Sequence, residues 1–211
     1  MNAQPGTAFK SLPAGADVLL VGPMLERAPS WPDCAILFVD GGARWQAHLP
    51  TDFPHPTLSV GDGDSHTSGD LDIALPVEKD YSDLGYALQL LPERTAVSLT
   101  LTGFLGGRRD HEWINFGEVA RFLEGRDRTL ARFDDAVIAL SAGQHALDHH
   151  GPFSLVNFSG GHTRITGDVD FPLTRSTWLA PHSSHGLSNG ARGAFQVWCE
   201  VPTLCFLVEE G

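Results

Sequence analysis

Three predicted strands that each run directly into a loop of glycine and polar residues constrain this chain most. The predicted strand Ala35–Val39 ends at Asp40–Gly42, and Thr57–Val60 ends at Gly61–Ser65. The alternating segment Thr95–Thr102 ends at Gly103, and Asp17–Val21 is a further continuous apolar run. Short, continuous apolar runs are typical of a buried parallel sheet. In such a sheet, ligands bind at the carboxyl ends of the strands. We therefore expect an α/β fold with its site in these loops.

Helical periodicity is confined to the first part of the chain. Apolar residues follow i, i+3, i+4, i+7 spacing from Leu84 to Leu91 and a similar spacing from Trp113 to Leu123. After about Arg126, short apolar segments alternate with Gly, Pro and Ser clusters, which is typical of an all-β sandwich or barrel. We predict a Rossmann-like α/β domain with a mostly parallel sheet over residues 1–130 and an all-β domain over 131–211.

Composition excludes several classes of protein. The 211 residues include 26 acidic and 14 basic side chains, a formal net charge of −12. This balance argues against nucleic-acid binding, which needs positive charge against phosphates, and a bound nucleotide would need a metal ion or a few placed cations. No apolar run is long enough for a membrane span, and Met1–Gly15 does not have the pattern of a signal peptide. Cys34, Cys199 and Cys205 form no ligand-like cluster, so a cytoplasmic location is expected.

Asp62-Gly63-Asp64 is the most informative motif. Residues two apart in an extended chain point to the same side, so both carboxylates can face one ligand. Two close carboxylates repel each other unless a cation lies between them, and oxygen ligands favour Mg²⁺ or Ca²⁺. The alternative interpretation is an ordinary turn, because Gly and Asp are common turn residues.

Two further charged loops precede the predicted helices. Lys79–Asp83 places two carboxylates and an ammonium before the first helix, either as helix capping or as a second wall of a metal–phosphate site. Gly106–His111 opens the second helix, where the accessible backbone N–H groups of the glycines and the Arg side chains could bind a phosphate. The alternative interpretation is a solvated charged turn. Asn115, one turn later, lies on the same helical face as His111.

Three other chemistries are excluded or disfavoured. Neither lysine, Lys10 or Lys79, stands in a P-loop pattern. Gly186–Gly190 matches Gly-x-Ser-x-Gly, but no Asp or His follows Ser188, as a serine hydrolase of that fold requires. The sequence contains neither a His-Glu-x-x-His pattern nor paired cysteines, which disfavours a zinc site.

Taken in order, the motifs resemble those of the thiamine pyrophosphokinase family. The matching segments are Asp40–Ala43 (Asp-Gly-Gly-Ala), Gly61–Ser65 (Gly-Asp-x-Asp-Ser), Lys79–Asp83 with Ala87-Leu88, Gly106–His111 (Gly-Gly-Arg-x-Asp-His) with Asn115, and Ser188-Asn189. The resemblance implies an α/β domain followed by a β-sandwich domain, a homodimer, and Mg²⁺-dependent transfer of pyrophosphate from ATP to the hydroxyl of thiamine.

The resemblance also implies roles for particular residues. The predicted metal ligands are Asp62, Asp64 and Asp83, and the predicted catalytic set adds Asp80, since Asp80 or Asp83 would accept the hydroxyl proton. The predicted nucleotide- and thiamine-binding residues are Asp40, Gly41, Gly42, Ser65, Lys79, Gly107, Arg108, Asp110, His111, Asn115, Ser188 and Asn189.

Two alternatives remain open at this point. A pterin or another hydroxymethyl heterocycle would be an acceptor of the same kind as thiamine. The other alternative is a catalytically inactive module that binds a nucleotide or thiamine. It is motivated by departures from the family pattern: only 14 residues separate Ser65 from Asp80, and Gly63 lies between Asp62 and Asp64. Gly85 and His185 are further departures.

Overall fold

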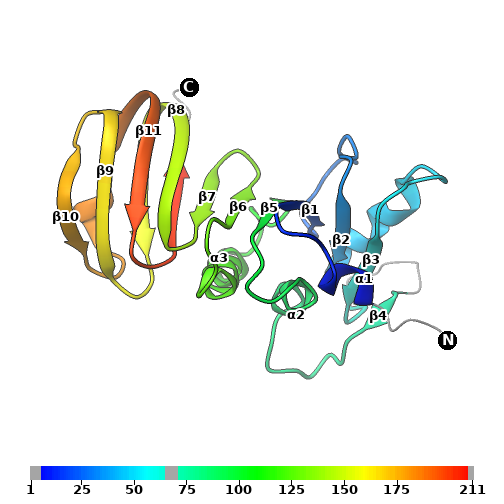
Figure 1. The fold of residues 1–211 in the computed structure, drawn as a ribbon. Helices are drawn as coiled ribbons and strands as arrows, with labels where there is room; N and C mark the ends of the chain where they lie inside the picture. The colour runs from blue at the N-terminus through cyan, green and yellow to red at the C-terminus, as the bar shows by residue number, and fades with distance from the viewer. Residues whose placement is uncertain (1–5, 65–70, 209–211) are drawn as a thin grey trace. The chain divides into compact units, whose positions relative to one another are not determined.

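The computed structural model describes residues 6–64 and 71–208, which divide into two compact units, Met1–Glu118 and Val119–Gly211 (Figure 1). The division falls inside helix α3 (Arg109–Leu123), so this helix belongs to both units. The domain boundary near residue 130 stays a prediction. Among the described residues, no helix combines the length and the apolar character that crossing a membrane would require.

The first unit is built on a parallel sheet. Its strands run in the order β5 (Val97–Thr102), β1 (Ala16–Val21), β2 (Ala35–Val39), β3 (Thr57–Gly61) and β4 (Ile73–Ala74), and each pairs in parallel with its neighbour. The predicted parallel α/β arrangement is confirmed. Every residue of β2 is buried, which explains why its sequence is a continuous apolar run. The two-residue strand β4 gives too short a pattern to be recognised in the sequence.

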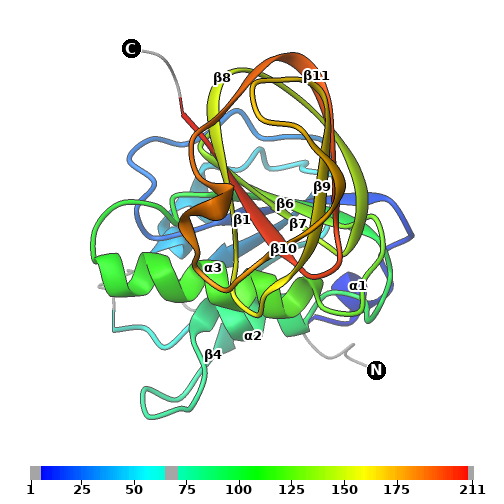
Figure 2. The same cartoon turned by 90° about the vertical axis from the view of Figure 1, so that its left-hand side faces the viewer.

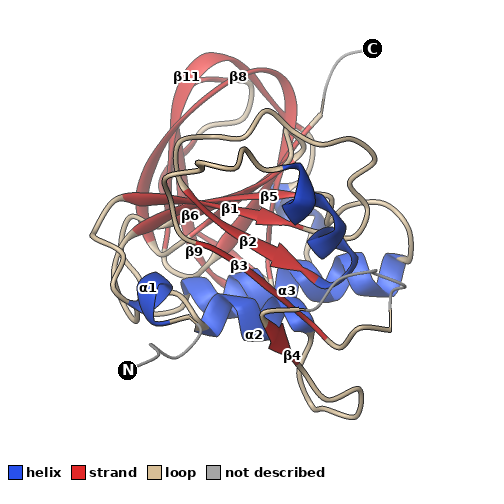
Figure 3. Cartoon of the chain, turned by 90° about the vertical axis from the view of Figure 1, so that its right-hand side faces the viewer, coloured by secondary structure: helices blue, strands red, loops and turns tan. Residues whose placement is uncertain are grey.

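The two faces of this sheet are covered by different elements. Helix α2 (Asp83–Gln89) contacts β2 and β3, and the 3₁₀ helix η1 (Asp40–His48) contacts β1, β2 and β3 (Figure 3). Alternate strand residues, such as Ile36 and Phe38, form a core cluster on the η1 side that includes Trp45. Neither η1 nor the short helix α1 (Thr7–Lys10) has a periodic apolar pattern long enough to predict.

A serine side chain caps the start of α2. Ser82 has extended backbone angles, and its hydroxyl oxygen accepts a hydrogen bond from the backbone N–H of Gly85 at 2.9 Å. Helix α3 begins at Arg109, four residues before its first periodic apolar residue, Trp113, because its first turn is polar. The cap and the first polar turn bring the loops before α2 and α3 into defined positions.

Gly42 is required where η1 passes the end of β1. A Cβ atom at Gly42 would lie 2.1 Å from the carbonyl oxygen of Val21, a backbone atom that cannot move independently. We expect Gly42→Ala to lower the free energy of unfolding by about 3 kcal/mol or more, because overpacking against backbone strains the sheet. Gly117→Ala is the control, since a Cβ there meets nothing within 4 Å and alanine favours the helix. Urea unfolding of both variants tests this, and equal stabilities would contradict it.

The second unit is an antiparallel sheet. Its strands follow the order β10-β9-β11-β8-β12-β7-β6, with antiparallel pairing throughout. The bounds are β6 (Leu130–Phe133), β7 (Val137–Leu140), β8 (Gly143–Asn157), β9 (Gly161–Val169), β10 (Leu173–Leu179), β11 (Asn189–Cys199) and β12 (Thr203–Leu207), with a 3₁₀ turn η2 at Ser184–Gly186. The predicted all-β character of this part of the chain is confirmed.

This sheet curls around one core. Figure 2 shows the curl of the ribbon from β8 to β10. Leu179 of β10 and Cys205 of β12 belong to the same buried cluster although three strands separate β10 from β12 in the sheet. The long strand β8 supplies Leu147 and Phe153 to that core. The apolar pattern of β8 is clear only near its end, because polar residues and Gly151-Pro152 interrupt it earlier.

Candidate active site

A cavity of about 570 Å³ lies in the first unit where the parallel strands end. Its walls come from the loops after β1, β2, β3 and β5 and from the segment that leads into α2. The lining residues are Pro23, Met24, Val39, Asp40, Asp62, Asp64, Lys79, Tyr81, Ser82, Asp83, Leu84, Phe104, Gly106, Gly107, Arg108, His111 and Asn115. The cavity therefore lies at the carboxyl edge of the sheet, where the sequence predicts the site, and its use as the site stays a prediction.

An acidic trio consisting of Asp40, Asp62 and Asp64 lies in this cavity. One carboxylate oxygen from each residue lies within 4.8 Å of the other two. Asp40 directly follows β2 and adopts a positive φ of 52°, a conformation that Asp tolerates better than most residues, and Asp62 and Asp64 follow β3. Three convergent carboxylate oxygens fit a hard divalent cation such as Mg²⁺.

Lys79 is the buried cation of the site. Its ammonium donates a hydrogen bond to Oδ2 of Asp62 at 2.7 Å and lies 3.0 Å from Oδ1 of Asp83. The side chain of Lys79 is 8% exposed, and those of Asp62 and Asp83 are each 12% exposed. Such a buried arrangement is stable only while all its charges are compensated.

The two aspartates paired with Lys79 differ in acidity. Burial acts to raise the pKa of Asp62, but the hydrogen bonds from Lys79 and Asp64 and the charge of Lys79 together outweigh it, so the pKa lies below its ordinary value. Burial also acts on Asp83 and here it prevails over Lys79, so the pKa of Asp83 is raised. For Lys79, burial opposes the charge, but the two carboxylates more than compensate, so its pKa is raised.

The grouping of the carboxylates differs from the grouping we inferred from the motifs. The motifs assign Asp62, Asp64 and Asp83 to the metal and Asp40 to the nucleotide. The structure groups Asp40 with Asp62 and Asp64, while Asp83 lies against Lys79. A sequence signal for Asp40 exists, since it follows a buried strand as Asp62 does, but its proximity depends on β2 and β3 being neighbours. The ligand set as a whole stays a prediction.

The Gly-Gly-Arg loop lines the cavity at the start of α3. The guanidinium of Arg108 forms an exposed ion pair with Asp110, with Nη2 and Oδ2 2.5 Å apart. The hydrogen bond from Arg108 lowers the pKa of Asp110 to about 2. An exposed pair of this kind contributes little stability, so Arg108 can exchange Asp110 for another anion at small cost.

Other predicted residues in this region are engaged within the protein. Asn115 donates from Nδ2 to the carbonyl oxygen of Phe104 at 3.1 Å, which joins α3 to the loop after β5. The N–H of Gly106 donates to Oε2 of Glu112 at 3.1 Å. Glu112, which sequence reasoning missed, therefore accepts from one of the backbone N–H groups expected to bind an anion. His111 is exposed and lines the cavity.

The remaining predicted residues of the first unit occupy different places. Gly41 and Gly42 are buried, and Gly42 packs against the backbone at the end of β1. Asp80 is exposed and is not among the residues that line the cavity. Ser65 lies outside the described residues.

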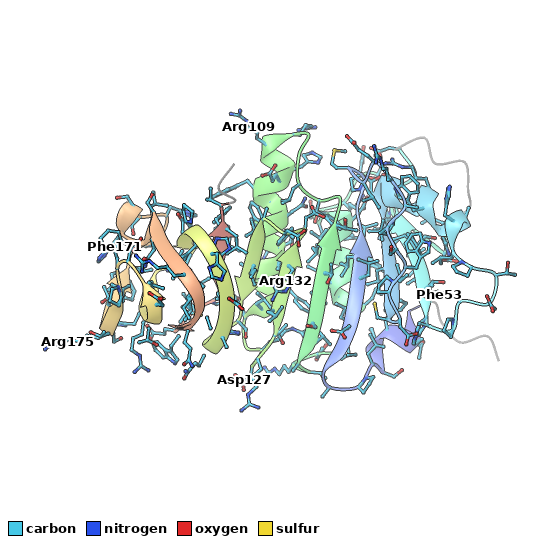
Figure 4. All side chains as sticks on the ribbon, turned by 90° about the horizontal axis from the view of Figure 1, so that it is seen from above. Phe53, Arg109, Asp127, Arg132, Phe171 and Arg175 are labelled. Atoms are coloured by element: carbon cyan, nitrogen blue, oxygen red, sulfur yellow. The ribbon has the colours of Figure 1, made fainter. Side chains whose placement is uncertain are left out.

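Ser188 and Asn189 belong to the second unit. Ser188 is exposed with a positive φ of 58°, and its N–H donates to Oγ of Ser154 at 3.1 Å. Asn189 is buried: its Oδ1 accepts from the N–H of Phe171 and its Nδ2 donates to the carbonyl of Phe171, each at 2.9 Å. Asn189 thus fixes the turn between β9 and β10, in which Phe171 lies with an exposed side chain (Figure 4).

Asn189→Ala is expected to lower the free energy of unfolding by about 2–3 kcal/mol, because it leaves backbone groups of Phe171 without their partners. Ser188→Ala is the matched control, since the Ser188 side chain is exposed and should contribute little. Thermal unfolding of both variants measures the difference. Equal midpoints would show that Asn189 does not hold the turn.

Comparisons with known proteins give no match by sequence. No family model matches the chain, and no curated protein matches it. Solved structures do match. Thiamin pyrophosphokinase from Geobacillus thermodenitrificans aligns with a TM-score of 0.68 and 21% identity, over 92% of this chain and 99% of that one. Thiamin pyrophosphokinase from Candida albicans aligns with a TM-score of 0.66 and 14% identity, over 92% of this chain and 90% of that one. The chain has the fold of the thiamin pyrophosphokinases. Yeast thiamin pyrophosphokinase shares this fold, with a TM-score of 0.59 and 11% identity over 96% of this chain and 89% of that one.

The fold implied by the motif resemblance is therefore confirmed. At these identities the likeness concerns the fold alone. Sequence reasoning missed the apolar part of the cavity formed by Pro23, Met24 and Phe104. A signal was present for Met24, because the loop Gly22–Met24 follows β1 just as the motif loops follow their strands.

Proposed function

We propose that this protein is a Mg²⁺-dependent pyrophosphokinase that transfers the diphosphoryl group of ATP to the hydroxyl of thiamine, releasing AMP. The observation that carries the proposal is the acidic trio beside buried Lys79 in a cavity at the carboxyl ends of the parallel strands. The cavity volume of about 570 Å³ lies in the range of small-molecule sites. The shared fold supports the same conclusion.

The acidic trio would hold the metal ion. When bound, Mg²⁺ neutralises triphosphate charge and stabilises the charge that develops on departing AMP. Asp40 and Asp62 are half-buried and so are held in place by the fold, whereas Asp64 is exposed. An acidic protein of net charge −12 needs such a site to accept a nucleotide.

The basic groups would hold the phosphates. Arg108 would exchange Asp110 for a phosphate, and the N–H of Gly107 at the start of α3 would add a further donor. Lys79 would keep Asp62 ionised through its hydrogen bond and present its charge to the phosphates. Most of the rate enhancement would come from this positioning and electrostatic stabilisation.

For the general base we favour Asp83 over Asp80. Asp83 lines the cavity, and burial raises its pKa, so it accepts a proton more readily than an ordinary aspartate. Asp80 is exposed and lies outside the cavity lining. In the second unit we assign thiamine contact to Ser188, with Asn189 shaping the turn beside it. A homodimer and a cytoplasmic location complete the proposal.

A coupled assay of AMP release tests the function. With ATP and Mg²⁺, thiamine should give AMP and thiamine diphosphate, and a chelator should abolish both products. A parallel series with a hydroxymethyl pterin and other hydroxymethyl heterocycles identifies the acceptor. AMP release with a pterin but not thiamine would change the substrate, and ligand binding without AMP release would indicate an inactive binding module.

A further inference from the structure

Met24 forms an apolar part of the cavity that none of the sequence motifs includes. It lies in the loop after β1, and its side chain lines the cavity while remaining 45% exposed. Phe104, from the loop after β5, also lines the cavity but is only 3% exposed. Met24 is therefore the accessible apolar side chain where these two loops meet.

The backbone around Met24 is held from two sides. The N–H of Met24 donates to the carbonyl of Gly103 at 2.9 Å. From η1, the guanidinium of Arg44 donates to the carbonyls of Pro23 at 3.0 Å and Leu25 at 2.6 Å. These bonds hold the loop on both sides of Met24, so the direction of its Cα–Cβ bond is set by the fold.

The thioether of Met24 also has a defined place. A Cβ atom at Gly107 would lie 2.7 Å from Sδ of Met24, so the sulfur packs against the bare backbone of Gly107. Gly107 has a positive φ of 80° and opens the turn into α3. The polarisable sulfur is thus held between this turn and the cavity.

The charges of the cavity divide it into two regions. The acidic trio, Lys79 and the start of α3 form the region suited to a metal ion and phosphates. Met24, Pro23 and Phe104 form an apolar region next to Gly107. A nucleotide has the same division, with an anionic phosphate chain and a flat aromatic base. Thioethers pack favourably against aromatic rings.

We propose that Met24 is a specificity-determining residue that packs against the base of the nucleotide substrate. This inference rests on the proposed function, because it assumes that the phosphate region takes a nucleoside triphosphate. It assigns the loop after β1 to the base and gives Gly107 a second role, namely leaving room for the Met24 thioether.

Direct binding measurements on the whole protein test this role without relying on activity. Calorimetry compares Mg²⁺–ATP with Mg²⁺–tripolyphosphate, which has the phosphates but no base. Met24→Ala should weaken ATP binding roughly tenfold and leave tripolyphosphate binding unchanged. Ile114→Ala is the control, since Ile114 is exposed on α3 and is not among the residues that line the cavity.

Three other outcomes would overturn the inference. Unchanged ATP binding in Met24→Ala would show that the base does not contact this side chain. Equal losses for ATP and tripolyphosphate would show that Met24 only supports the loop. If the unaltered protein bound neither probe, the proposed function would fail together with this inference, which distinguishes that failure from the first two.

Discussion

Asp62→Asn and Asp64→Asn should each lower the rate of AMP release by roughly 10³-fold or more, because each removes one negative charge from the trio that would hold Mg²⁺ against the triphosphate. Asparagine has nearly the same size, so the cavity keeps its shape. Asp64 is exposed, and its substitution should leave the free energy of unfolding almost unchanged. Asp62 is bonded to Lys79, so Asp62→Asn should also cost some stability.

The measurement is steady-state AMP release at saturating thiamine and varied Mg²⁺, with thermal unfolding recorded for each variant. Asp52→Asn is the matched control, because Asp52 is exposed and lies outside the cavity lining. Near-normal turnover in both Asp62→Asn and Asp64→Asn would rule out the metal role of the trio. Loss of activity in the control as well would point to a general charge effect.

Lys79→Met is expected to lower the free energy of unfolding at pH 7 by about 3 kcal/mol, because it leaves two buried carboxylates without their cation. Asp62 and Asp83 would then repel each other and Asp40 in a partly buried site. Added Mg²⁺ should restore part of the lost stability, since a divalent ion would replace the missing positive charge. Urea unfolding with and without Mg²⁺ measures both effects.

The pH dependence of Lys79→Met supplies an internal check. In the unaltered protein the pKa of Asp62 is lowered, so its ionised form contributes stability above its ordinary pKa of 3.8, and this stability is lost as the pH falls. Without Lys79, burial would raise the pKa values of Asp62 and Asp83, so the variant should gain stability as the pH falls from 7 towards 5. The difference in the free energy of unfolding between Lys79→Met and the unaltered protein should therefore become smaller as the pH falls.

Lys10→Met is the control for Lys79→Met, because Lys10 is exposed and the chain has no other lysine besides these two. A constant difference in stability between pH 7 and pH 5 would contradict the role of Lys79 as a buried counter-ion. A gain from Mg²⁺ of equal size in Lys10→Met would show that the ion acts elsewhere.

Local patterns were sufficient to predict most elements of the first unit. The buried runs of β1, β2 and β3 and the periodic face of α2 indicate their own conformations, because burial on both faces or on one face dictates the pattern. Elements without a pattern of their own could not be predicted in this way. Examples are η1, whose burial comes from packing on the sheet, and the middle of β8.

By itself, the sequence determined that carboxylates and glycines follow the predicted strands, and hence where a site would form. Only the tertiary structure decided that Asp40 joins Asp62 and Asp64, that Lys79 is buried between Asp62 and Asp83, and that Asn189 is used inside its own unit. The physical reason is that charge compensation and hydrogen bonding depend on distances between segments far apart in the chain. Strand order and packing determine these distances, and local sequence does not encode them.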